Sequence, residues 1–196
     1  METKINKLQI AAFTTNSEFY IPFEIFSIYS EKNPHHGSII KKENSFRFFF
    51  TVSETKYLAI IHPINNLSKI DDACSYADCV VFFIDLESQN SKELTENITN
   101  YIRDNFPSDK KVYVIGMTSD KTKNIVDFGE KEICDVLEKS NLLFDYKEVC
   151  SNEKSEVTSA IDFILSDNIE VFCDFQKHSA MELRLDRCNS GPCIIM

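Results

Sequence analysis

Apolar and polar positions alternate along the chain in blocks that predict a regular succession of strands and helices. Runs of β-branched and aromatic residues predict strands, and apolar residues recurring with a helical period predict helices. Strands are expected at residues 7–13, 45–52, 56–62, 77–86, 111–116 and 142–149, and helices at residues 17–29, 88–106, 127–140 and 154–173. A polar loop is expected at residues 31–38, and the mixed, polar chain from residue 174 is typical of a flexible tail.

The order of these elements predicts the fold class. A strand, a helix and a hairpin, followed by strand–helix alternation, are typical of an α/β protein with a sheet wound on both faces. Residues 77–86 are apolar almost without interruption, as in a strand that is covered on both sides. We predict one domain over residues 1–173, with a doubly wound, mostly parallel six-stranded sheet and helices on both faces, and a tail at 174–196. Ligands of such sheets bind at the carboxyl ends of the strands.

Composition narrows the class of protein. The 196 residues are 43% hydrophobic and include 16 Phe, which indicates a packed core. A net charge of -10 argues against nucleic acid as a partner and opposes adhesion to an anionic membrane surface. Seven cysteines without a secretory signal predict reduced thiols. We therefore expect the protein in the cytoplasm or on the cytoplasmic face of a membrane.

The last nine residues read CNSGPCIIM, and Cys193 with the three residues after it matches the rule for prenylation, with a terminal Met that favours farnesyl. Gly191 and Pro192 separate this end from any preceding strand or helix. Coincidence and a buried final strand are the alternatives. One prenyl chain alone anchors weakly, so palmitoylation of Cys188 is a candidate second signal, the alternative being an unmodified thiol. The predicted partner of the tail is a membrane.

Three further segments carry a resemblance to a known family. ADCVVFFIDLESQNSKELTENITNYI (77–102), KVYVIGMTSD (111–120) and EVCSNEKSEV (148–157) occur in the expected order in a chain of the expected length. Together with the tail they make the chain similar to the small GTPases of the Ras/Rab superfamily, over roughly residues 5–173. The resemblance implies the P-loop NTPase fold and, for many members, a prenylated C-terminal cysteine. It implies much less about activity, because one fold supports many functions.

The phosphate-binding motif of that family is missing here. Members carry G-x-x-x-x-G-K-[ST] after the first strand, where glycines let the backbone wrap the phosphates and the lysine neutralises them. Residues 12–19 read AFTTNSEF, so Glu18 stands at the lysine position and Phe19 at the hydroxyl position. Residues 9–30 contain no Lys or Arg, and no glycine precedes Gly37, so this conclusion does not depend on the alignment. We predict that the phosphate cradle is absent.

The two switch segments of the family are also altered. Residues 30–44 contain no Thr to reach a magnesium ion. Where Asp-x-x-Gly-Gln would hold the metal and the attacking water, residues 62–66 read HPINN. We therefore predict no catalytic residue, no metal site and no cofactor. His35 and His36 are adjacent and lack the spacing of metal ligands.

The base-binding end is less altered. MTSD (117–120) stands for Asn-Lys-x-Asp, and CSN (150–152) for Ser-Ala-Lys. The resemblance therefore makes Asp120 and Ser151 candidate residual nucleotide-binding residues. The alternative is that Asp120 is an ordinary turn or helix-capping residue.

Residues 39–62 form the candidate surface for a protein effector or adaptor. Strand alternation places Phe46, Phe48 and Phe50 on one face, expected to be core, and Phe49 on the other, where a helix or a partner covers it. In the family this region contributes to effector surfaces.

The resulting hypothesis is a lipid-anchored, small-GTPase-like protein that does not bind or hydrolyse GTP normally. It would act as a binding or adaptor module in vesicle trafficking or signalling. A divergent but working GTPase that binds GTP or GDP with Mg²⁺, and reads the base through Asp120, is the alternative. A third hypothesis is an unrelated doubly wound domain whose tail matches the prenylation motif by chance.

Overall fold

The computed structural model describes residues 6–15, 21–32, 40–42, 45–64, 77–108, 110–119 and 128–169. The elements are β1 (Asn6–Thr14), α1 (Ile21–Lys32), β2 (Ile40–Lys42), β3 (Ser45–Val52), β4 (Thr55–Ile64), β5 (Cys79–Asp85), α2 (Ser91–Asn105), β6 (Val112–Thr118), α3 (Glu130–Lys139) and β7 (Phe144–Cys150). A further helix at residues 154–169, here called the final helix, follows β7. All six predicted strands are present, and the three-residue β2 was missed.

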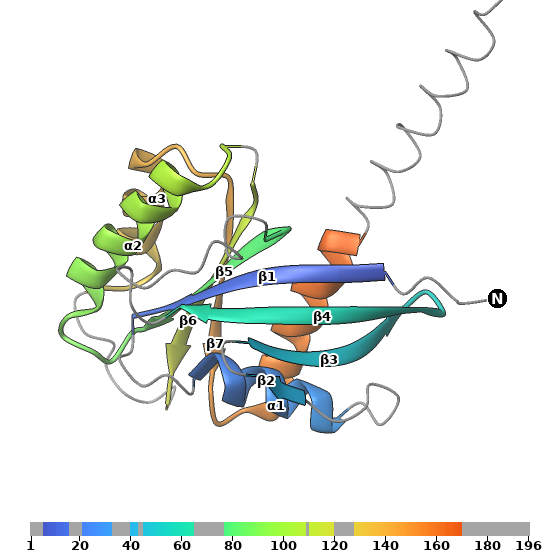
Figure 1. Cartoon of the computed structure of the whole chain (residues 1–196). Helices are drawn as coiled ribbons and strands as arrows, with labels where there is room; N and C mark the ends of the chain where they lie inside the picture. The colour runs from blue at the N-terminus through green and yellow to red at the C-terminus, as the bar shows by residue number, and fades with distance from the viewer. Residues whose placement is uncertain are drawn as a thin grey trace, which may run out of the picture.

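The strands form one mixed sheet in the order β2-β3-β4-β1-β5-β6-β7. β4, β1, β5, β6 and β7 run parallel to one another, and β3 is antiparallel to both of its neighbours, β2 and β4. Figure 1 shows helices on both faces of this sheet: α1 and the final helix cover one face, and α2 and α3 cover the other. The predicted α/β class with a mostly parallel sheet is confirmed, and the arrangement is compatible with double winding. The sheet has seven strands in the described residues, not six.

The face under α1 and the final helix is lined by aromatic rings. Phe46, Phe48 and Phe50 alternate along β3 and are all buried, as the sequence predicted. Phe26 of α1 lies against two of them, with ring centroids 5.8 Å from those of both Phe46 and Phe48. α1 also contacts the final helix, because the hydroxyl of Tyr29 donates to Asp162 Oδ1 at 2.8 Å. Aromatic packing therefore joins α1 to the hairpin, and a hydrogen bond joins α1 to the final helix.

β3 and β4 form the predicted antiparallel hairpin, joined by a two-residue turn. Val52 pairs with Thr55, so Ser53 and Glu54 alone make the connection. Both have positive φ, 46° and 66°, which a tight hairpin turn requires and which Asn or Gly adopts more easily. At its other end β4 is longer than predicted. It continues to Ile64, in register with Phe13 of β1.

Gly116 on β6 occupies a position with no room for a side chain. A Cβ there would lie 2.4 Å from the hydroxyl oxygen of Tyr146 on β7. The Tyr146 hydroxyl donates to Glu148 Oε1 at 3.0 Å. We expect Gly116→Ala to lower the free energy of unfolding by about 1–2 kcal/mol, because the ring must shift and disturb this bond. Urea unfolding measures the change. The same substitution in a Tyr146→Phe background removes the closest oxygen and is expected to cost less; an equal cost in both backgrounds would contradict this explanation.

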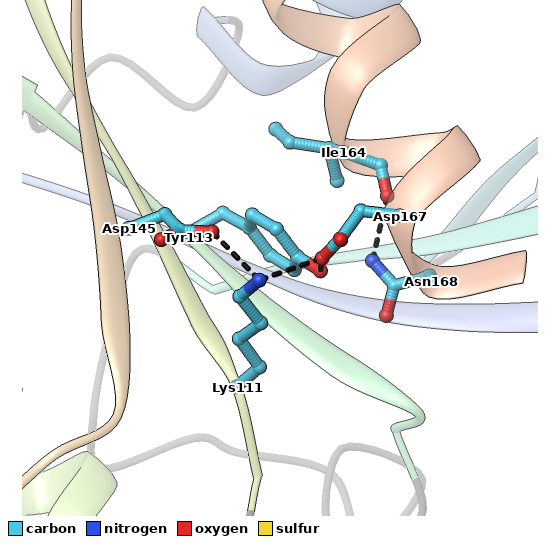
Figure 2. A network of polar contacts seen from close by, with 6 residues as sticks. All are labelled: Lys111, Tyr113, Asp145, Ile164, Asp167 and Asn168. Carbon is cyan, nitrogen blue, oxygen red and sulfur yellow. Dashed lines mark hydrogen bonds and ion pairs between the residues drawn. The ribbon is translucent and has the colours of Figure 1, made fainter. Parts of the chain in front are cut away.

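A polar network, the Lys111 network, lies at the opposite end of the sheet from the carboxyl ends of β6 and β7. Lys111 Nζ lies 2.7 Å from Asp145 Oδ2 on β7 and 2.7 Å from Asp167 Oδ2 on the final helix (Figure 2). The Tyr113 hydroxyl also donates to Asp167. On the same turn Asn168 Nδ2 donates to the carbonyl of Ile164 at 2.7 Å. The network therefore holds the last described turn of the final helix against β6 and β7.

Candidate functional site

The direction of chain winding changes between β1 and β5, which are neighbours in the sheet. α1 leads away from β1 toward β3 and β4, whereas α2 leads from β5 toward β6 on the other side. Sheets of this kind leave a crevice at the carboxyl ends of the strands where the winding diverges. The residues at this edge are Thr15 after β1, Asp85 and Glu87 at the end of β5, Ser119 after β6 and Ser151 after β7. This edge is therefore the candidate functional site.

Hydroxyl groups join β1, β5 and α2 at the centre of the edge. Thr15 donates its backbone N–H to the Phe83 carbonyl at 3.0 Å, and its Oγ1 accepts from the backbone N–H of Asp85 at 2.9 Å. The Ser91 hydroxyl, at the start of α2, donates to the carbonyl of Asp85. Thr15 Oγ1 and Ser91 Oγ are 3.4 Å apart, and both residues are buried. These polar groups thus bond to one another in the fold.

Glu87 bridges the ends of β5 and β6. Its Oε1 accepts from the backbone N–H of Ser119 at 2.6 Å and from the Ser119 hydroxyl at 2.8 Å. The hydroxyl is also 2.9 Å from Oε2, and the backbone N–H of Glu87 donates to Asp85 Oδ1 at 3.0 Å. One carboxylate therefore takes both donors of Ser119. In a parallel sheet the two residues meet because Asp85 and Met117 are in register.

Ser151, a predicted nucleotide-binding residue, lies at this edge but bonds to the neighbouring strand. Its backbone N–H and its hydroxyl both donate to the carbonyl of Thr118, at 2.8 and 3.1 Å. Asn152 Nδ2 donates to the carbonyl of Ser119 at 2.6 Å. The segment after β7 is thereby fastened to the segment after β6.

Several predicted residues lie outside the described part of the chain. Asp120, Cys188 and Cys193 are among them, as are residues 16–20 of the altered phosphate-binding segment. Of the candidate partner surface 39–62, residues 40–42 and 45–62 are described. The motif at 62–66 begins inside β4, because His62, Pro63 and Ile64 still pair with β1.

Sequence reasoning missed the central residues of the edge: Thr15, Glu87 and Ser91. The available signal was position alone, since each is a polar residue directly after a buried strand or at the start of a helix. Thr15 follows β1, and Glu87 follows the apolar run of β5. Polar residues are common at such positions, so their pairing is visible only in the structure.

The described residues contain no group of three His, Cys, Asp or Glu side chains arranged to hold a metal ion. Within the same residues, no helix has the length and apolar character needed to cross a membrane. Comparison with known protein families found no matching family model, and no curated protein matches the chain.

Proposed function

We propose that this protein is a small-GTPase-like binding or adaptor module that does not use a nucleotide switch. It would be held at the cytoplasmic face of a membrane through lipid on Cys193, with Cys188 as a second acylation site, and would bind a protein effector through residues 39–62 in trafficking or signalling. The strand order and the helices on both faces support a small-GTPase-like fold, within which these roles are proposed.

The observation that carries the proposal is that, in the described part of the candidate site, the donors of Ser119 and Ser151 already pair with acceptors of the fold. Ser119 gives both donors to Glu87, and Ser151 gives both donors to Thr118. A nucleotide needs free donors for its base and phosphates. Hydrogen bonds to a carboxylate are among the stronger ones in proteins, so a ligand would have to displace good partners before binding.

Charge acts in the same direction. Asp85 and Glu87 place two carboxylates at the end of β5, next to the point where winding changes. Unit charges about 4 Å apart near a protein surface interact by roughly 4 kcal/mol, and here the sign is repulsive toward a phosphate. The sequence adds no Lys or Arg in residues 9–30 to offset it. A triphosphate would therefore meet repulsion at the edge where the family binds it.

A working but divergent GTPase is the rival proposal. The order of the segments after β6 and β7 favours it, because Asp120 and Ser151 then stand where the family reads the guanine base. In that case the contacts of Ser151 would rearrange on binding.

Titration of the purified full chain with GTP and GDP, with and without Mg²⁺, tests the two proposals by calorimetry. We expect no binding at micromolar nucleotide. A matched Asp120→Asn variant separates the two proposals further. It is expected to behave like the wild type if no nucleotide binds, and to lose affinity if the rival is correct. Micromolar or tighter binding that Asp120→Asn abolishes would overturn the proposal.

A further inference from the structure

The β3–β4 hairpin has a second face, on the side of the sheet away from α1 and the final helix. Strand alternation puts Arg47 and Phe49 of β3 opposite the buried Phe46 and Phe48, on the face that α2 and α3 cover farther along the sheet. The register pairs Arg47 with Ile60, Phe49 with Leu58, and Thr51 with Lys56. We call Arg47, Phe49, Lys56, Leu58 and Ile60 the hairpin face.

Three apolar side chains of the hairpin face, Phe49, Leu58 and Ile60, lie outside both core clusters, although Ile60 itself is buried. The described residues place one cluster under α1 and the other under α2 and α3. Phe49 and Leu58 are half-buried, whereas their neighbours Phe48 and Ala59 are fully buried. The face therefore carries two apolar side chains, Phe49 and Leu58, that remain partly exposed outside the described core clusters.

The hairpin face also concentrates positive charge in an acidic protein. Lys56 Nζ lies 4.4 Å from the centre of the Phe49 ring. Arg47 is the next residue along β3 from Phe49 on the same face. The carboxylate of the hairpin, Glu54, lies in the turn at its tip. Among the described residues the hairpin face thus carries two cations and no carboxylate, although the full chain has a net charge of -10.

Arg47 adds an unsatisfied group. Among the described residues its buried Nε has no hydrogen-bond partner. A buried donor without a hydrogen-bond partner lowers the stability of the folded protein. A carboxylate is the group that fits, because a planar guanidinium can pair with two carboxylate oxygens at once, and pairing through Nε–H requires the partly exposed side chain to turn this atom toward the surface.

We propose that the hairpin face binds an acidic peptide segment, in which a Glu or Asp pairs with Arg47 and an aromatic or aliphatic side chain packs on Phe49 and Leu58. This inference rests on the proposed role as a binding module and names the chemistry of its partner. Charge pairs of this kind act within a Debye length of about 8 Å, so the net negative charge of the chain does not prevent them. It does oppose a continuous polyanion or an anionic bilayer.

Selection of random peptides displayed on phage against the immobilised full chain tests the proposal. We expect the selected peptides to be enriched in Asp or Glu next to aromatic or aliphatic residues. Synthetic versions of these peptides should bind the protein in fluorescence polarisation, and their affinity should fall as the salt concentration is raised. Selection of peptides without acidic enrichment, or of none that bind, would overturn the proposal.

The variant Arg47→Met keeps the length of the side chain and removes the fork. We expect this variant to lower the affinity for the selected peptides by about tenfold or more, which is the equivalent of one lost charge-assisted hydrogen bond. Because the unsatisfied donor disappears, its melting temperature should stay unchanged or rise by up to about 4 °C. A structural role for Arg47 predicts the reverse, with lower stability and unchanged peptide affinity, and would contradict the proposal.

Arg103 on α2 gives the matched control, since it is an exposed arginine on another element whose Nε pairs with Asp104. Arg103→Met should leave peptide affinity unchanged; an equal loss in both variants would mean non-specific attraction and would overturn the proposal. If the protein binds vesicles that contain phosphatidylserine and Arg47→Met abolishes this binding, the hairpin face binds a membrane and the proposal of a peptide ligand is overturned. Failure of the proposed function has a different result: nucleotide binding in calorimetry would contradict it, and Arg47→Met should not alter that binding.

Discussion

Phe26→Ala is expected to lower the free energy of unfolding by about 3–5 kcal/mol, the largest effect of any substitution considered for this chain. Phe26 is 0% exposed, and its ring lies 5.8 Å from Phe46, 5.8 Å from Phe48 and 6.2 Å from Phe83, measured between centroids. It therefore joins α1 to β3 and β5 at once. Truncation removes the apolar burial of a large ring and leaves a cavity among rigid aromatic neighbours that cannot collapse to fill it.

Urea unfolding followed by circular dichroism measures this loss. Phe163→Ala on the final helix is the matched control, because Phe163 is 44% exposed and the one ring it contacts among the described residues is Tyr113, at 6.1 Å. Its cost is expected to be about 1 kcal/mol. Equal costs for the two variants would show that α1 does not pack on the sheet as described.

The sequence predicted the sheet well because burial on both faces leaves a strong pattern. The run at β5 and the alternation of Phe46, Phe48 and Phe50 both identified their strands and faces correctly. β2 was missed because three residues are too few to show alternation. β4 was ended too early at His62, because a proline usually interrupts a strand. Pro63 is tolerated because it lies beyond the last β3–β4 pair, at Ile61, where β1 is the neighbour that remains.

The candidate site was harder to predict because its bonds join residues far apart in the chain. Glu87 and Ser119 are 32 positions apart, and Thr15 and Asp85 are 70 apart. Their meeting depends on parallel register, which local periodicity does not specify. The sequence proposed Ser151 by resemblance, and the structure places this residue directly after β7, where its bonds to Thr118 follow from the pairing of β6 with β7.

Lys111→Met is expected to lower the free energy of unfolding by about 2–3 kcal/mol at neutral pH. The side chain of Lys111 is 27% exposed, so the effect lies between that of an exposed ion pair and that of a buried one. Methionine keeps the length of the side chain and leaves Asp145 and Asp167 as two carboxylates without their shared cation. Lys110→Met is the control, because Lys110 makes no ion pair within the described residues; its effect should stay within about 0.5 kcal/mol.

The pH dependence of this loss follows from two opposite pKa shifts. Burial disfavours the charge on Asp167, but hydrogen bonds from Lys111 and Tyr113 outweigh it and hold its pKa below the usual range. Burial likewise opposes the charge on Lys111, and its hydrogen bonds to Asp145 and Asp167 outweigh that and raise its pKa. The carboxylate contribution is complete above the unfolded pKa of about 3.9 and is lost as pH falls through the lower folded value. The lysine contribution is complete below its unfolded pKa of about 10.4 and is lost as pH rises through the higher folded value.

The difference in stability between wild type and Lys111→Met should therefore be largest from about pH 5 to pH 9 and shrink below about pH 4. Urea unfolding at a series of pH values measures it, with Lys110→Met as the flat reference. Because the Lys111 network sits at the opposite end of β6 and β7 from Ser119 and Ser151, the variant should leave the bonded carboxyl edge intact. A difference that does not change with pH would mean that Lys111 stabilises the final helix by packing over Tyr113 rather than by pairing with Asp167.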